Sequence, residues 1–496
     1  MPSFLPLLLL IVPLLAALTC LVPARAALAE WVSGVVALAV LALGLWLVSA
    51  TGVRPASVQP GLYVDALTAV LILVISVVGA VSILYSLSYL RREVALGHLT
   101  AGQTRWYFLW LHLFIFCMLL VALAANLGVL WVAMECTTVV SGVLVGFYRK
   151  PESLEAAWKY VVICSLGIAL ALFGTVLIYY SAVQVLGQGT DALNWATLRG
   201  VAPRLDPSLA RLSFAFVLVG YGTKAGLAPM HTWLPDAHSQ APSPVSAVLS
   251  AVLLNCALYA ILRFHALTIR AVGPDFSTHL LLAFGLLSIA IAVPFLIIQH
   301  DLKRLLAYSS MEHVGIITTA VGIGGKLGLF AALLHLINHA AAKSTMFLGS
   351  GTVIQRLGTR NIHRLGGAGR VAPGLAALVL LGGLALAGSP PFSPFIGEFT
   401  AVRAAFSGHI IYAGVILLIL LALAFGGLLA HLGRVALGPA SHRRHGALPP
   451  APITWTERIG VAALAMPAAA VLALGLHVPS GLVTLVQHAA AVVGGA

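Results

Sequence analysis

The stretch from Tyr221 to Ser250, YGTKAGLAPMHTWLPDAHSQAPSPVSAVLS, decides how the rest of the chain is read. It places Lys224, two histidines and an aspartate among several glycines and prolines, within a run of apolar segments of helical length. An unbroken helix is the lowest-cost backbone inside a membrane, because it satisfies its own hydrogen bonds. A polar, Gly/Pro-rich break at this depth therefore predicts a functional site, and we predict a proton site at Lys224.

The composition is that of a polytopic membrane protein. Of the 496 residues, 60% are hydrophobic and only 8% are charged, and the mean hydropathy is +1.04. The net charge of +13 is spread over short loops, which excludes the concentrated basic patch of a nucleic-acid-binding protein. The cysteines occur singly, without the spacing of a zinc site, an iron–sulfur cluster or a disulfide framework. They are Cys20, Cys117, Cys136, Cys164 and Cys256.

Apolar runs about 20 residues long recur along the chain and predict an all-α fold with about fourteen transmembrane helices. Residues 1–30 also imitate a signal peptide, but no Lys or Arg precedes the long apolar run, which favours a retained first helix. A last apolar piece, 480–494, is short for a span. The predicted spans lie near residues 4–23, 32–51, 64–88, 107–124, 127–147, 159–182, 212–228, 243–263, 278–299, 305–322, 328–353, 373–400, 409–432 and 457–477.

The distribution of basic residues predicts the orientation. Loops that follow odd-numbered spans carry most of the Lys and Arg residues, for example Arg91, Arg92, Arg149 and Lys150. Because such loops favour the cytoplasmic side, both termini are expected on the non-cytoplasmic side of a prokaryotic inner membrane.

Two similar tripeptides indicate an internal repeat. Span five carries MEC around Glu135 and span ten carries MEH around Glu312, and each precedes a Gly/Pro-broken span that holds Lys224 or Glu398. Five spans separate each element from its counterpart; since five is odd, the second copy is predicted to be inverted, with helices 7 and 12 broken. The expected units are N-terminal helices in 1–100, a first repeat in 101–265, an inverted repeat in 266–435 and a C-terminal helix and tail in 436–496.

Glu135 and Lys224 are the first candidate pair for proton transfer. Burial disfavours the charged form of both side chains, whereas mutual proximity favours it. A lysine whose charge depends on the distance to a glutamate can carry protons in a switchable way. The alternative is a static buried ion pair that only holds two helices together.

A second candidate group is the stripe formed by His335, His339 and Lys343, which recur every four residues on one helix face. Imidazole can both donate and accept a proton near neutral pH, which suits a relay. Core histidines that only bond to neighbouring helices are the alternative. The HxxxH pair lacks the glutamate of zinc proteases, so we expect no metal site.

His231, Asp236 and His238 form a third polar group. They suit either a metal cluster or a solvated loop after span seven, and the loop is the interpretation we favour.

At these residues the chain resembles the proton-translocating antiporter-like subunits of respiratory complex I, cation/proton antiporters and membrane-bound hydrogenases. The resemblance covers roughly residues 60–435. Within this family, the segments LEAAWKYVVICSLGIALALFG, YSSMEHVGI and VLLNCALYAILRF are most similar to component F of hydrogenase-4 type complexes. The segments that carry the family resemblance are WVAMECTTVVSGVLVGFY, GTKAGLAPMHTWLPDAHSQAPSPVSA, DLKRLLAYSSMEHVGI, HLINHAAAKSTMFL and the broken helix before Glu398.

The resemblance implies a proton pathway across the membrane domain. It assigns the inner pair to Glu135 and Lys224, the span-eleven histidine to His335 or His339, and the terminal group to Glu398. Span eight departs from the family pattern, because Ser250 or Asn255 stands where a lysine or histidine is expected. Neither can hold a proton charge, although either can support a chain of waters.

The function that this resemblance implies is proton translocation by a non-redox membrane subunit of an oxidoreductase complex, of the hydrogenase or NADH-quinone oxidoreductase type. No cofactor is expected in this chain; iron–sulfur clusters and a metal or flavin centre are expected in partner subunits. The expected partners are other membrane subunits, a peripheral redox module, protons and the lipid bilayer, with no nucleic acid. The alternatives are a cation/proton antiporter subunit and the energising membrane subunit of an inorganic-carbon uptake complex.

Overall fold

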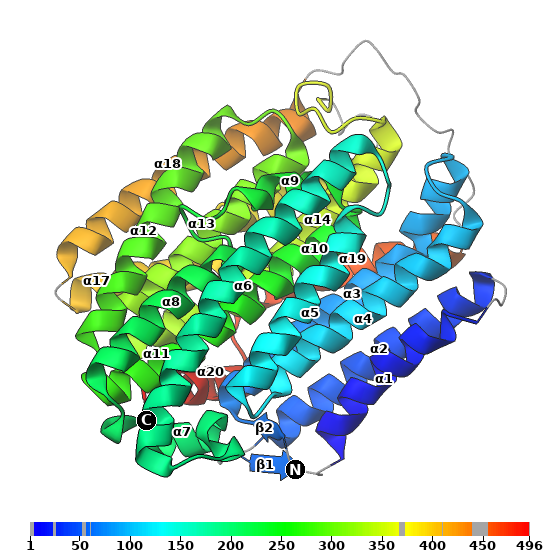
Figure 1. The fold of residues 1–496 in the computed structure, drawn as a ribbon. Coiled ribbons are helices and arrows are strands. Elements are labelled where there is room, and N and C mark those ends of the chain that lie inside the picture. Colours follow the sequence, from blue (N-terminus) through cyan, green and yellow to red (C-terminus); the bar gives the residue numbers. More distant parts are fainter. Residues whose placement is uncertain are drawn as a thin grey trace.

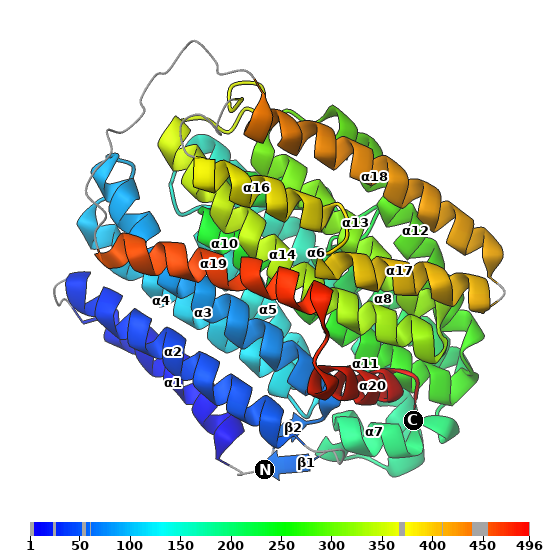
Figure 2. The same ribbon diagram turned by 180° about the vertical axis from the view of Figure 1, so that it is seen from behind.

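The computed structural model describes residues 4–22, 26–51, 56–59, 61–366, 373–408, 410–438 and 455–495, and these residues form a bundle of long helices (Figures 1 and 2). The N-terminal part comprises α1 (Leu5–Thr19), α2 (Ala26–Ala50), α3 (Ala66–Ala95), α4 (Ala101–Leu123), α5 (Leu127–Val145) and α6 (Pro151–Leu186). The central part comprises α7 (Trp195–Val201), α8 (Pro207–Ala225), α9 (Trp233–Gln240), α10 (Ser243–Val248), α11 (Leu254–Val272), α12 (Asp275–Ile298), α13 (Leu302–Ile323) and α14 (Gly325–Leu357). The C-terminal part comprises α16 (Pro373–Leu386), α17 (Ser393–Ser407), α18 (Ile411–Leu437), α19 (Trp455–Leu476) and α20 (Ser480–Val493).

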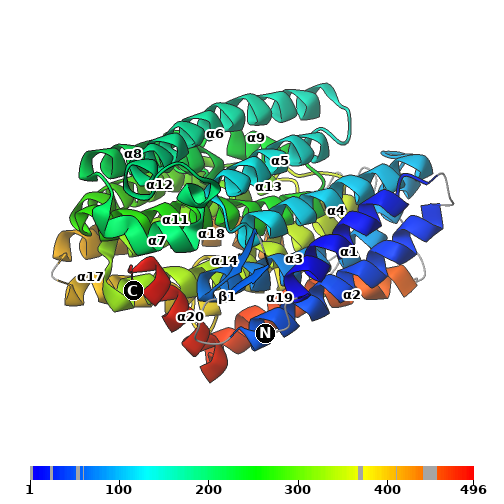
Figure 3. The ribbon, with the colours of Figure 1, turned by 60° about the horizontal axis from the view of Figure 1, so that its bottom comes forward.

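The chain is an all-α polytopic membrane protein, as its composition predicts. Within the described ranges, nine helices are long and apolar enough to cross a membrane, and each predicted span coincides with a helix or with a pair of short helices. One short antiparallel hairpin, β1 (Ala56–Gln59) and β2 (Leu62–Val64), lies between α2 and α3 and was not predicted. Figure 3 shows this hairpin, α7 and both drawn chain ends at the same end of the bundle.

Both predicted helix breaks are present. At the first break, α8 ends at Gly226, whose φ of +76° is in the left-handed region that suits glycine. The chain then turns before it resumes as α9. The second break separates α16 from α17 and contains Gly388, with φ of +69°. A π-helical turn, Leu249–Leu253, joins α10 to α11. Such turns often occur at functional sites.

The predicted loop after span seven is partly wrong. Asp236 and His238 lie on α9, which packs between α6 and α13 (Figure 1), and only His231 lies in the turn before it. Asp236 pairs with Arg304 at 2.6 Å, and the buried His238 ring stacks on Phe347 with 5.2 Å between ring centroids. Hydropathy cannot distinguish such a helix from a loop, because its polar groups are covered by other parts of the chain.

Glycines allow two helix pairs to approach closely. A Cβ atom on Gly220 of α8 would come within 2.5 Å of the Ala171 backbone nitrogen on α6. A Cβ atom on Gly285 of α12 would meet the Thr319 nitrogen of α13 at the same distance. Small residues at such crossings are typical of membrane helices, whose association depends on close van der Waals contact.

A buried ion pair ties the start of α3 to α11. Arg263 donates to both carboxylate oxygens of Asp65, at 2.6 and 2.8 Å, and its guanidinium lies 4.6 Å from the centroid of the Trp195 ring. Asp65 also caps α3 by accepting from the Thr68 backbone N–H. This fully bonded pair holds two elements that are almost 200 residues apart.

Candidate functional site

Lys224 occupies the last turn of α8, directly before the first helix break, and its side chain is completely buried. Its ammonium group donates to the Thr138 hydroxyl on α5 at 2.7 Å and to the Tyr160 hydroxyl on α6 at 2.6 Å. It also lies 4.8 Å from the centroid of the Tyr160 ring, within cation–π range. Three helices therefore meet at this one charge.

Glu135 lies on α5, one turn before Thr138. Its carboxylate accepts from Ser165 of α6 at 2.6 Å and from Thr138 at 3.3 Å. The ion pairs of the described residues include none between Glu135 and Lys224. The Thr138 hydroxyl connects them instead, since it can donate to the carboxylate while it accepts from the ammonium.

Three hydroxyl groups of this site were not identified from the sequence: Thr138, Tyr160 and Ser165. The Tyr160 hydroxyl is also within 2.6 Å of Ser141 on α5, which extends the polar contacts between α5 and α6. The available signal was helical spacing, because Thr138 and Ser141 follow Glu135 at intervals of three on one face. The sequence spacing does not show that Tyr160 and Ser165 of α6 lie beside these α5 residues, because their proximity comes from the packing of the two helices.

Asn255 lies on α11 and Ser250 on the π-helical turn before it, and both side chains are fully buried. The Ser250 hydroxyl is 2.7 Å from that of Ser310 on α13. Asn255 donates to the Ala251 carbonyl of its own helix at 2.7 Å, and its buried side-chain oxygen has no partner among the described residues. A buried acceptor without a partner is costly in protein alone and is suited to a water molecule.

Lys343 of α14 begins the second polar region, and it is fully buried. Its ammonium group donates to the Leu306 carbonyl of α13 at 3.0 Å. Glu312, also on α13, is buried and within electrostatic range of Lys343, and one of its carboxylate oxygens has no partner among the described residues. A buried carboxylate and a buried lysine thus occur in this half of the molecule too.

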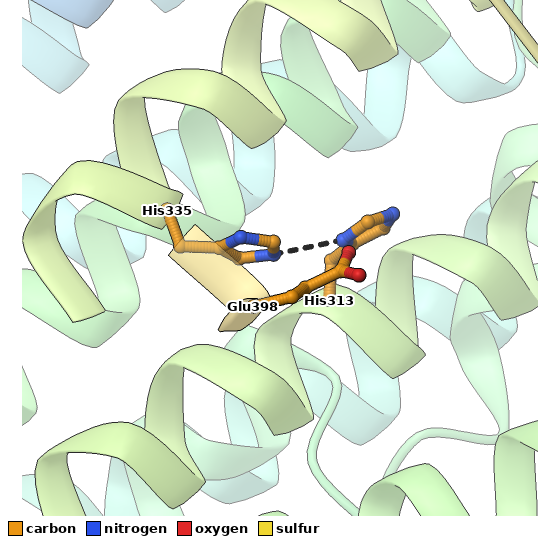
Figure 4. A group of neighbouring side chains, drawn as sticks. All are labelled: His313, His335 and Glu398. Carbon is orange, nitrogen blue, oxygen red and sulfur yellow. Dashed lines mark hydrogen bonds between the residues drawn. The ribbon is translucent and has the colours of Figure 1, made fainter. Parts of the chain in front are cut away.

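His335 and His339 lie on the same face of α14 as Lys343. The structure brings Glu398 of α17, already a sequence candidate, and His313 of α13 next to them. The His313 Nδ1 and His335 Nε2 atoms are 2.9 Å apart, and Glu398 lies beside them (Figure 4). The His339 ring is 5.2 Å from that of His313 between centroids. We name His313, His335 and Glu398 the His–His–Glu cluster.

Two glycines at the second helix break make room for this cluster. A Cβ atom on Gly397 would come within 2.6 Å of His335 Nδ1, and one on Gly388 would collide with the Glu398 carboxylate. The break therefore brings backbone close to the cluster, an approach that only glycine permits. His313 was noticed in the sequence only as part of the repeated tripeptide.

The third polar group of the sequence, His231, Asp236 and His238, does not assemble as metal ligands. In the described part of the chain the only group of three potential ligand side chains is the His–His–Glu cluster. Asp236 instead contacts Arg304 at 2.6 Å and Lys159 at 3.7 Å.

Comparisons with known proteins place these residues in a wider context. The family described as NADH:quinone oxidoreductase/Mrp antiporter, transmembrane region, matches residues 124–424, and the complex I chain 5 N-terminus matches residues 51–97. The chain is 43% identical to a hydrogenase-4 component F homolog of Methylacidiphilum infernorum, covering 76% of this chain and 79% of that protein. It is 33% identical to hydrogenase-4 component B of Escherichia coli, covering 70% of this chain but only 51% of that longer protein.

A solved structure supports the fold. A chain of the membrane-bound sulfane sulfur reductase, an archaeal respiratory membrane complex, superimposes with a TM-score of 0.85 at 24% identity, covering 99% of this chain and 97% of that one. The similar chain of known structure is thus part of a multi-subunit membrane complex.

Proposed function

The chain belongs to the family of antiporter-like membrane subunits found in NADH:quinone oxidoreductases and Mrp antiporters, and we propose that it moves protons as the non-redox membrane subunit of a respiratory oxidoreductase complex. Both the membrane-bound hydrogenase type and the NADH-quinone oxidoreductase type fit this proposal. One observation carries it: a completely buried lysine lies at a helix break and contacts a glutamate through one hydroxyl group. Ionisable groups inside a membrane are costly and are retained mainly where they act on ions or protons.

In the proposed mechanism the charge on Lys224 depends on the distance to Glu135. When the two approach, the carboxylate stabilises the ammonium and Lys224 takes up a proton. When they separate, the ammonium is left with the hydroxyls of Thr138 and Tyr160, which are weaker partners than a carboxylate, and the proton is released. The arrangement in the structure, with Thr138 between them, is consistent with the separated state.

The released proton next passes the middle of the molecule. Neither Asn255 nor Ser250 can hold the proton charge, so this step needs water, and the unpartnered oxygen of Asn255 offers one anchoring point. Beyond it, Lys343, His339 and His335 offer groups that can accept and donate protons, and Glu398 is the proposed exit.

Two similar halves are proposed for this pathway, within a fold of about fourteen membrane helices. In the first half α5 carries Glu135 and packs on α4 and α6, and the broken helix α8 carries Lys224. In the second half α13 carries Glu312 and packs on α12 and α14, and the broken helix that includes α17 carries Glu398. The matching neighbours support two repeats, which we propose as 101–265 and an inverted 266–435, flanked by 1–100 and 436–496.

The proposed setting is a prokaryotic inner membrane, with both termini on the non-cytoplasmic side. The common position of both chain ends at one end of the bundle agrees with an even number of crossings (Figure 3). Redox chemistry is assigned to partner subunits that carry iron–sulfur clusters and a metal or flavin centre. Energy then reaches this chain through contacts with its neighbours, as expected for a subunit without a cofactor of its own.

The proposal is tested by Lys224→Ala in the assembled complex. Proton movement into vesicles should be abolished while much of the electron transfer continues, because the change removes the proton carrier and leaves the partner subunits intact. Lys326→Ala is the matched control, since Lys326 is exposed at the start of α14. Undiminished proton movement in the Lys224 variant would contradict the mechanism.

A second candidate is a cation/proton antiporter subunit, which the Mrp antiporter part of the family description favours. Sodium prefers several clustered oxygen ligands, whereas Glu135, Glu312 and Glu398 lie on three different helices. Proton movement that requires sodium and resists protonophores would favour this alternative over the first.

A further inference from the structure

We propose that the His–His–Glu cluster binds a divalent transition-metal ion of the zinc class. We further propose that the bound ion blocks proton transfer through the second half of the molecule. The binding is argued from geometry alone, and the block rests on the proposed function.

The donor types and spacing suit such an ion. His313, His335 and Glu398 each offer one ligand atom, and these atoms all lie within 4.8 Å of one another (Figure 4). Two imidazoles and a carboxylate are a frequent ligand set for zinc, with metal–ligand distances near 2.0–2.1 Å. Tetrahedral geometry then places ligand atoms about 3.4 Å apart, so the cluster needs only small side-chain movements to close on an ion.

The two histidines can offer lone pairs without losing a proton. At present one of the facing atoms, His313 Nδ1 or His335 Nε2, must donate a hydrogen to the other across 2.9 Å. The outer atoms, His313 Nε2 and His335 Nδ1, are buried. The backbone of Leu386 is close enough to the His313 ring, and that of Pro394 to the His335 ring, to accept a hydrogen. The shared hydrogen can therefore move to an outer nitrogen of the same ring, which leaves both facing atoms as acceptors for the metal ion.

Neighbouring groups determine how the coordination of the ion is completed and how the ion affects proton transfer. His339 offers two nitrogens without a partner among the described residues, and its ring is 5.2 Å from His313, so it or a water molecule can be the fourth ligand. Glu312 is within electrostatic range of Glu398, so its carboxylate would offset part of the positive charge of the ion, whereas the Lys343 ammonium, within range of His313, would oppose that charge. A bound ion would thus occupy the lone pairs that a proton needs and would repel a proton arriving on Lys343.

A second histidine pair provides a control. His300 Nδ1 and His363 Nε2 are 3.1 Å apart at the surface, but the Arg434 guanidinium lies 3.0 Å from His363 Nδ1. A fixed positive charge at that distance disfavours a bound cation. If a metal ion nevertheless bound at this surface pair, His363→Ala would weaken that binding. Binding at the His–His–Glu cluster should not change in this variant.

The binding test is a titration of the purified full chain with Co²⁺ alone, read by visible absorption. We expect about one equivalent to give the intense bands of four-coordinate Co²⁺, and Zn²⁺ to displace them. His313→Ala and the milder His335→Gln should each weaken Co²⁺ binding by at least about tenfold, whereas His363→Ala should leave it unchanged. No such bands in the wild-type chain, or bands that persist in both cluster variants, would overturn the site.

The block is tested separately, by adding Zn²⁺ to the assembled complex during proton movement. We expect Zn²⁺ to inhibit both the wild type and His363→Ala. In His335→Gln, which should itself slow proton movement because His335 lies on the proposed pathway, the remaining proton movement should no longer respond to Zn²⁺. If wild type binds Co²⁺ but Zn²⁺ leaves proton movement unchanged, the site stands and the exit route through Glu398 is wrong. If Lys224→Ala abolishes proton movement and no Co²⁺ binds, the proposed function stands and the metal site is wrong.

Discussion

Replacing Thr138 by valine isolates the contact between Glu135 and Lys224. Threonine and valine side chains have nearly the same shape, so the substitution replaces one hydroxyl group by a methyl group and changes little else. That hydroxyl accepts from the Lys224 ammonium at 2.7 Å and is 3.3 Å from the Glu135 carboxylate. In the proposed mechanism it holds Lys224 in place when the carboxylate is distant. Thr138→Val should therefore slow proton transfer without preventing assembly.

The size of the effect follows from the bond that is lost. A hydrogen bond to a charged group contributes about 1.5–3 kcal/mol, and each 1.4 kcal/mol corresponds to about a tenfold change in rate. The full range is thus about 10- to 150-fold by the same conversion. Lys224 retains its 2.6 Å bond to the Tyr160 hydroxyl and the cation–π contact with that ring. We therefore expect the lower end, a loss of about tenfold.

The assay is proton movement into vesicles by the assembled complex, measured beside electron transfer in the same preparation. Thr137→Val is a matched control on the adjacent position of α5, because among the described residues the Thr137 hydroxyl bonds only within its own helix, to Met134. Equal losses in the two variants, or full activity in Thr138→Val, would show that the hydroxyl does not couple the pair.

Two further predictions concern the middle of the pathway and the stability of the fold. Asn255→Ala should reduce proton movement while the complex still assembles, because it removes a buried, unpartnered oxygen that can anchor water; unchanged proton movement would show that the water chain does not depend on it. Arg263→Met should lower the free energy of unfolding by about 3–5 kcal/mol, since it leaves the Asp65 carboxylate buried without its partner. Adding Asp65→Leu should restore part of that loss in a thermal unfolding assay, and a double variant less stable than Arg263→Met alone would contradict the explanation.

Much of the fold could be predicted because hydropathy and helix breaking are local properties. A run of apolar residues defines a span whatever surrounds it. Single prolines are tolerated inside α1, α12 and α19, whereas the clustered glycines and prolines after Lys224 and before Glu398 favour a break. Helix α9 escaped prediction for the opposite reason. Its Asp236 and His238 are polar in sequence, and they suit a helix only because Arg304 and Phe347 cover them.

The sequence alone predicted a membrane protein, the positions of both helix breaks and a set of candidate ionisable residues. Only the tertiary structure decided which of those residues meet. It placed Thr138 between Glu135 and Lys224, and it joined His313, His335 and Glu398 from three helices into one cluster. The physical reason is that hydropathy and helix breaks are properties of one segment, whereas the burial of a charge and the partners of that charge depend on how several helices pack.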